Sequence, residues 1–167
     1  MITGTNWGAT ESERMLPLDC DSLLPKANGV AHRAVSIATP PSTVFPWLCQ
    51  LRVAPYSYDL LDNFGKRSPR VLIPGMVNLE VGQRFMVLFS LSSFVVDRHI
   101  TLRSERVAVT YALLPTETGS RLVVRVRAVI PAAGLLTAPL ALGDLFMMRK
   151  QLHTLKSLAE RTGSHDA

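Results

Sequence analysis

Apolar and polar residues alternate with a period of two along much of the second half of the chain, which is typical of β-strands. In residues 121–127 the apolar side chains at even positions alternate with Arg121, Arg125 and Arg127. In residues 107–113 large apolar residues at odd positions alternate with small ones. Because successive side chains of a strand point to opposite faces, the three arginines should lie on the face opposite the apolar one.

Similar patterns predict further strands, bounded by turn-forming residues. The turn-rich segment 115–120 predicts a hairpin connection. The strands expected from the sequence are residues 32–38, 85–91, 94–96, 100–102, 106–114 and 121–130.

Helical spacing occurs in three places. Val44, Trp47, Leu48 and Leu51 recur at i, i+3, i+4 and i+7 and predict a helix with one buried face, with Thr39 as its N-cap. Residues 56–64 predict a second short helix, which would end at Gly65. Residues 139–161 carry apolar residues at 3-4-3-4 spacing and predict one long amphipathic helix.

The order of these elements predicts an α+β, helix-grip architecture: a curved antiparallel sheet wrapped around a long C-terminal helix, with two short helices after the first strand. A sheet curved around a helix can enclose a hollow. The 167 residues allow one domain, at residues 30–163. Residues 1–29, broken by glycine and proline, are expected to form an arm that packs without regular structure, and residues 164–167 a disordered tail.

Composition adds a question and excludes several classes of function. Hydrophobic residues make up 47% of the chain and charged residues 19%, and the mean hydropathy is +0.20. The apolar surplus could fill a core, a ligand cavity or a membrane contact. The net charge of +5 comes from scattered residues rather than a basic run, so we expect no nucleic-acid partner.

Motifs for metals and cofactors are absent from the sequence. Cys20 and Cys49 lack CxxC spacing, and the histidines lack HxxxH and HExxH spacing, so we expect no metal. The sequence contains no GxGxxG, GKS or GxSxG motif, which argues against nucleotide cofactors and serine hydrolysis. Two thiols and an N-terminus without a secretory signal favour the reducing cytoplasm.

A set of short motifs occurs in one order along nearly the whole chain and resembles a known family, the SRPBCC superfamily of START-like or polyketide cyclase/dehydrase-like helix-grip proteins, in a bacterial subgroup. The matching positions are residues 7–10, Glu13, 23–25, 33–38, 40–41, 44–48, Gln50, 56–59, 61–63, 73–74, 81–82, 120–127 and 147–160. The resemblance implies the helix-grip fold and a deep apolar cavity for lipids, sterols or polyketides. Some members are cyclases, dehydratases or hydrolases.

Three regions depart from the subgroup pattern, all near the expected cavity rim. Residues 51–55 replace a glycine-rich basic turn, Leu60 stands where tryptophan is common, and residues 84–103 look shortened. A relative's ligand is therefore not transferred to this chain.

Candidate ligand-binding residues are apolar and aromatic side chains expected in the cavity or at its mouth, together with Arg98. They are Trp47, Tyr56, Tyr58, Phe94, Arg98, Tyr111, Met148 and Leu152. Core packing is the competing interpretation for Trp47 and Tyr111, and helix capping for Asp59 with its neighbouring tyrosines.

The tripeptide Asp97-Arg98-His99 is the densest polar cluster among the apolar strands and has two interpretations. A turn would leave all three residues in solvent, and we favour it. A continuous strand would instead bury Arg98, which would then need an anionic partner or a ligand carboxylate.

Three functions remain open, and the first is favoured. The chain binds a hydrophobic small molecule between the sheet and the last helix, with no cofactor. Alternatively it is a cyclase or dehydratase in which Tyr58, Asp59, Arg98 or His99 act as acid–base groups on a polyketide-like substrate. The third is a peripheral membrane or partner-interaction protein, suggested by the apolar stretch 128–148 and the positive charge. The sequence favours membrane contact least and leaves the ligand and the oligomeric state open.

Overall fold

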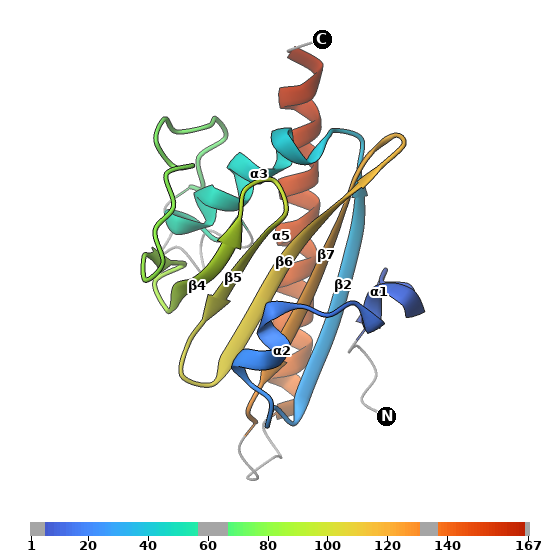
Figure 1. Ribbon diagram of the computed structural model, residues 1–167, viewed down its shortest axis with the longest axis vertical. Coiled ribbons are helices and arrows are strands. Elements are labelled where there is room, and N and C mark those ends of the chain that lie inside the picture. The colour runs from blue at the N-terminus through green and yellow to red at the C-terminus, as the bar shows by residue number, and fades with distance from the viewer. Residues whose placement is uncertain (1–5, 57–66, 131–136, 166–167) are drawn as a thin grey trace.

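The chain folds into one sheet that packs against one long helix. The computed structural model describes residues 6–56, 67–130 and 137–165, with side chains in the last range from Met148 to Ser164. Within these residues seven strands form a single sheet in the order β1-β2-β7-β6-β5-β4-β3. Helix α5 lies behind this sheet, and α1 and α2 lie in front of it (Figure 1). This is the α+β helix-grip architecture that the sequence predicts.

The elements have the following bounds: β1 Asn6–Trp7, α1 Glu11–Met15, α2 Asp19–Leu23, β2 Gly29–Ile37, α3 Pro41–Cys49, η1 (a 3-10 turn) Gln50–Arg52, β3 Arg84–Phe85, β4 Phe89–Val95, β5 His99–Arg103, β6 Val107–Thr116, β7 Gly119–Ala128 and α5 Thr137–His165.

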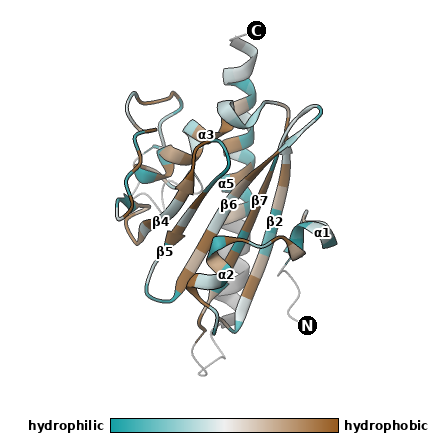
Figure 2. Cartoon of the chain, in the orientation of Figure 1, coloured by the Kyte–Doolittle hydropathy of each residue, from teal (hydrophilic) through white to brown (hydrophobic). Residues whose placement is uncertain are grey.

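The inner face of the sheet, toward α5, carries the main hydrophobic core. Its strand side includes Val109, Tyr111, Leu122 and Val124, all buried, and Leu155 of α5 is fully buried against them. Residues of contrasting hydropathy alternate along β2 and its neighbours (Figure 2). The period-two pattern of the sequence thus separates the two faces as predicted.

The outer face is covered by the N-terminal arm, which is more regular than the sequence suggests. The arm contains a strand, β1, and two five-residue helices, α1 and α2. Thr10 and Glu13 form a capping box at the start of α1. The expectation of an irregular arm is wrong, because helices this short show no full period of apolar spacing and depend on such caps.

Several predicted boundaries also change. The run expected as one strand at 85–91 is divided by a turn at residues 86–88, between the end of β3 and the start of β4. Helix α3 has Pro40 rather than Thr39 as its N-cap, and the Thr39 backbone carbonyl accepts a hydrogen bond from Ser120. Helix α5 reaches His165, inside the expected tail. The helix expected at 56–64 lies outside the described residues, apart from Tyr56.

Candidate binding site between the sheet and the last helix

A buried hydrogen-bonded pair joins the sheet to α5. The Tyr111 hydroxyl on β6 donates to Oε1 of Gln151 on α5 at 2.8 Å. The Gln151 amide nitrogen donates to the Pro55 carbonyl at 2.6 Å and lies 3.5 Å from Sδ of Met86. Tyr111 is 1% and Gln151 4% exposed. Sheet, helix and the segment after η1 therefore meet at one amide group.

A second buried polar pair extends this junction along the chain. Gln50 of η1 donates through Nε2 to the Tyr56 hydroxyl at 2.5 Å and to the Val71 carbonyl at 3.2 Å, and its Oε1 accepts from the backbone N–H of Ile73. The Tyr56 ring stands edge-on to Trp47, with centroids 6.1 Å apart. Gln50 thus fastens the loop that follows residue 67 to the core.

These phenol and amide groups can orient a ligand through hydrogen bonds. Both groups offer donors and acceptors within an apolar interior, where an unmatched polar group costs free energy. The neighbouring Cys49 is fully buried, and burial raises the pKa of its thiol to about 12. Cys49 is therefore not an activated nucleophile.

Most of the predicted ligand-binding residues lie at or against this inner face. Trp47, Tyr56, Tyr111 and Leu152 belong to the main core. Phe94 and Met148 pack against it while partly buried. Tyr58 and Asp59 lie outside the described residues.

The Asp97-Arg98-His99 cluster lies elsewhere. Residues 96–98 form the turn between β4 and β5, which confirms the favoured interpretation for Asp97 and Arg98, and Arg98 is exposed. For His99 that interpretation is wrong, because His99 begins β5 and is half-buried. The continuous strand with a buried Arg98 is wrong. Asp97 adopts a φ of 59°, which aspartate tolerates in tight turns. His99 points to the outer face, where its Nε2 lies 3.2 Å from Oδ2 of Asp19.

Gln50 and Gln151 were not among the sequence candidates, although the sequence contains a signal for them. Gln151 interrupts the apolar stripe of the last helix, between Met148 and Leu155. Gln50 similarly follows Trp47 by three residues. A polar residue on the buried stripe of a helix needs a buried partner, so such positions identify polar junctions.

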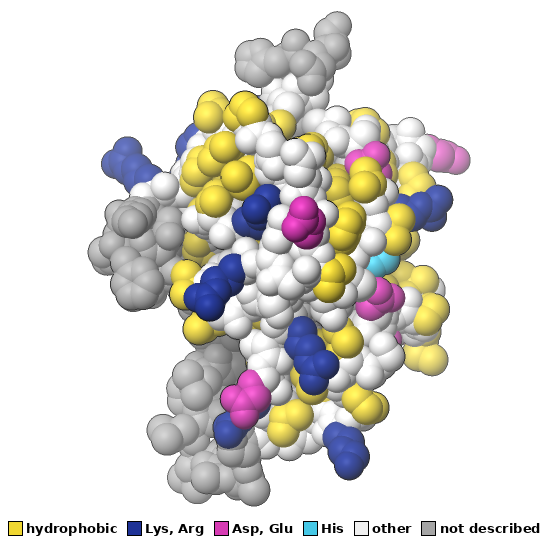
Figure 3. Space-filling view, turned by 60° about the vertical axis from the view of Figure 1, so that its left-hand side comes forward, with side chains coloured by type: hydrophobic (Ala, Val, Ile, Leu, Met, Phe, Trp, Pro, Cys, Tyr) yellow, Lys and Arg dark blue, Asp and Glu magenta, His cyan; other side chains and the backbone are white. Residues whose placement is uncertain are grey.

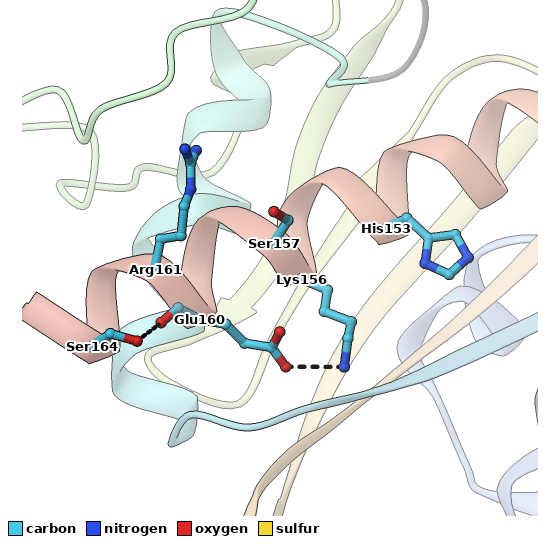
Figure 4. A pocket seen from close by; sticks show the side chains of 6 residues that line it. All are labelled: His153, Lys156, Ser157, Glu160, Arg161 and Ser164. Atoms are coloured by element: carbon cyan, nitrogen blue, oxygen red, sulfur yellow. Dashed lines mark hydrogen bonds and ion pairs between the residues drawn. The ribbon is translucent and has the colours of Figure 1, made fainter.

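A separate surface hollow runs along the exposed side of α5 (Figure 4). It is open, with a volume of about 410 Å³, and all its lining residues come from this helix: His153, Lys156, Ser157, Glu160, Arg161 and Ser164. Lys156 is already paired with Glu160 at 2.9 Å, and Arg161 points away from that pair (Figure 4). The hollow lies apart from the sheet–helix junction and offers no enclosed volume.

Among the described residues, no three His, Cys, Asp or Glu side chains are arranged to hold a metal ion. In the same part of the chain, no helix is both long and apolar enough to cross a membrane.

Comparisons with known proteins define the fold and no more. No family model matches the chain, and no curated protein matches it. Among solved structures, a protein from Mesorhizobium loti is similar at 17% identity and a TM-score of 0.52, covering 80% of this chain and 98% of its own. A protein from Nitrosomonas europaea is similar at 13% identity and a TM-score of 0.52, covering 81% and 96%.

A more distant similarity is to a Polyketide_cyc-like protein from Corynebacterium glutamicum, at 12% identity and a TM-score of 0.39, covering 81% of this chain and 92% of that one. The two structures with TM-scores of 0.52 share the α+β fold of this chain, and identities this low leave the ligand open.

Proposed function

We propose that this protein is a member of the SRPBCC superfamily that binds a hydrophobic small molecule, lipid-like or polyketide-like, between its sheet and α5. The observation that carries the proposal is the Tyr111–Gln151 pair, a donor and an acceptor buried within an otherwise apolar sheet–helix interface. Apolar walls with a few convergent polar groups are the usual composition of a small-molecule site. The fold, in which one sheet packs around a long C-terminal helix, supports the same interpretation.

The Tyr111–Gln151 pair would orient the ligand, and the apolar faces of the sheet and α5 would provide most of the binding affinity. A ligand hydroxyl can accept from the Tyr111 hydroxyl and donate to Oε1 of Gln151, so that it replaces the present 2.8 Å bond and leaves neither group unpaired. Exchanging one hydrogen bond for another is nearly neutral in free energy, whereas leaving a buried partner unpaired costs about 1–3 kcal/mol. The site would therefore prefer apolar ligands with one oxygen function over pure hydrocarbons.

Binding of a dansyl-labelled fatty acid to the purified protein, with native mass spectrometry to detect a co-purifying ligand, tests the proposal. We expect saturable enhancement of dansyl fluorescence and displacement by an unlabelled fatty acid or aromatic polyketide. Tyr111→Phe should weaken binding of an oxygen-bearing ligand about tenfold, the value of one good hydrogen bond in a dry site.

The neighbouring residue on β6 provides a matched control. Thr110 is equally buried but lies on the outer face, so Thr110→Val removes one hydroxyl from the same strand and should leave probe affinity unchanged. Absence of saturable binding, or equal effects of the two substitutions, would overturn the proposal.

A further inference from the structure

Exposed aliphatic side chains gather around the β3–β4 turn and the loop that precedes it. Val87 is 61% and Leu88 77% exposed at the tip of the turn. The preceding loop exposes Val77 and Val81, at 48% and 67%, while its Met76 packs against the core. Met76 thus anchors the loop to the core, while the other apolar side chains of the loop face solvent. A group of exposed apolar side chains, unlike a single one, indicates an interaction surface.

The backbone of this turn is strained at Met86 and Val87. The Leu88 N–H donates to the Met86 carbonyl at 2.7 Å, which closes a three-residue turn. Val87 at its centre has a φ of 64° and Met86 a φ of 43°. A β-branched residue rarely adopts positive φ, and such strain persists where the surroundings enforce it. Burial does not explain valine here, because the side chain is exposed.

Two arginines flank the apolar tip. Arg84 on β3 and Arg103 on β5 both pair with Ser90 of β4 in the sheet register, so they lie on the same, outer face, about 10 Å apart across three strands. Both are exposed, and among the described residues neither takes part in an ion pair. Together with Val87 and Leu88 they line an open depression of about 480 Å³.

We propose that this surface, comprising Arg84, Val87, Leu88 and Arg103, docks onto an anionic phospholipid membrane. Guanidinium groups bind phosphate oxygens, and the aliphatic tip would enter the acyl region just below the headgroups. Arg84 and Arg103 outnumber Glu105, the acidic residue that lines the depression. Basic and acidic side chains both lie among hydrophobic ones on this side of the molecule (Figure 3), so the charge argument rests on the two arginines beside the aliphatic tip. Paired guanidinium groups next to exposed aliphatic side chains favour an anionic lipid over a purely hydrophobic protein partner. The inference does not depend on the proposed function.

Flotation with phosphatidylglycerol–phosphatidylcholine vesicles, and with phosphatidylcholine alone, tests it. We expect binding to the anionic vesicles at about 0.01 M salt, where the Debye length is about 30 Å, and its loss at about 1 M, where it is about 3 Å. Arg84→Gln and Arg103→Gln should each lower the partition coefficient about fivefold. Leu88→Ser should lower it about tenfold.

Matched controls lie away from this surface, at the other end of β4 and on α5. Val96 is 60% exposed in the β4–β5 turn, so Val96→Ser removes an equally exposed aliphatic side chain, and Arg161→Gln removes an exposed charge from α5. Both should bind vesicles as the unmodified chain does. Val87→Asn, which tolerates positive φ, should weaken binding without loss of folding, as checked by circular dichroism.

Three outcomes would overturn the inference. The first is no binding to anionic vesicles at low salt. The second is equal weakening by the control substitutions. The third is sedimentation showing that Leu88→Ser abolishes self-association without affecting vesicles, which would assign the surface to a second copy of this chain. Undiminished binding in the presence of excess glycerol phosphate, with loss on Leu88→Ser, supports docking to the bilayer over capture of a free phosphate.

Discussion

The two faces of the sheet are covered by helices of very different length, and they hold those helices by different forces. The inner face packs against α3 and the 29-residue α5 through aliphatic and aromatic side chains. The outer face carries the five-residue helices α1 and α2. There the buried Arg125 donates to the carbonyls of Leu16 and Arg14, each at 2.7 Å, and to Asp21 at 2.5 Å.

Helix length explains the difference. A five-residue helix cannot bury enough apolar surface to offset the entropy lost when it docks. Hydrogen bonds from a rigid guanidinium to several carbonyls supply the remaining stabilisation, because each satisfies a carbonyl group that the short helix leaves unpaired. The inner face should therefore respond to lost volume, and the outer face to lost charge or changed pH.

The largest effect is expected from volume lost on the inner face. Leu155→Ala should lower the free energy of unfolding by about 4 kcal/mol, because Leu155 is fully buried and its removal leaves a cavity. Leu24→Ala on the outer face, where the leucine packs in a small cluster with Cys20, should cost about 2 kcal/mol. Urea unfolding followed by tryptophan fluorescence measures both. Equal losses would show that the outer face is as densely packed as the inner one.

Charge removal from the outer face comes next. Arg125→Met should lower the free energy of unfolding by about 3 kcal/mol, because it removes the 2.5 Å bond to Asp21 and leaves several backbone carbonyls without their donor. Arg127→Met is the matched control. Arg127 lies two residues along β7, is more exposed, and meets Asp21 at 3.4 Å, so its loss should cost under about 1 kcal/mol. Identical losses in urea titrations would contradict the ranking.

The sequence predicts the sheet better than its outer cover, and the reason is periodicity. The alternation around Arg121 and Arg125 places both on the outer face as predicted, because strand geometry alone fixes it. What those arginines bind is not visible in the same way: Arg125 reaches back more than a hundred residues to the arm. The alternation also does not predict that the chain reverses at Val87, because valine rarely adopts the positive φ that it has there.

The residues of the candidate site also differ in whether periodicity predicts them. Trp47, Tyr111 and Leu152 are found by periodicity because they are apolar positions of a buried face. Gln50 and Gln151 are polar, and pattern reasoning passes over them unless each polar residue on a buried stripe is treated as one half of a hydrogen bond. Their partners, at Tyr56 and Tyr111, come from other elements and follow only from the tertiary structure.

A smaller effect should separate buried hydrogen bonds on the two faces. Gln50→Leu removes the bonds to Tyr56, to the Val71 carbonyl and to the Ile73 N–H, and should cost about 2 kcal/mol because several buried partners are left unpaired. Thr101→Val on the outer face removes one bond, at 2.9 Å to Thr110, and should cost about 1 kcal/mol. Urea titration measures both. A larger loss for Thr101→Val would show that the Gln50 network contributes little to the inner face.

The smallest effect is a dependence of the arm on pH. Burial, with the neighbouring Arg125 charge, lowers the pKa of His32 below 6.5. The unfolded chain then binds a proton that the folded chain resists, so stability present above pH 6.5 is lost as the pH falls through the folded pKa. The hydrogen bond from Arg121 holds the pKa of Glu13 below 4.5, so a second contribution, present above pH 4.5, is lost as the pH falls through that lower value.

Both groups lie on the outer face, and acid should therefore loosen the arm before it affects the inner core. Hydrogen exchange at the Cys20 N–H, which donates to Thr110, should accelerate relative to the intrinsic rate as the pH falls. Exchange at Val124 in the central sheet should follow global stability alone. His32→Gln should remove the first step and Glu13→Gln the second, each leaving the other in place. A parallel change in protection at Cys20 and Val124 would mean that the arm and core open together, and that the two faces form one cooperative unit despite their different chemistry.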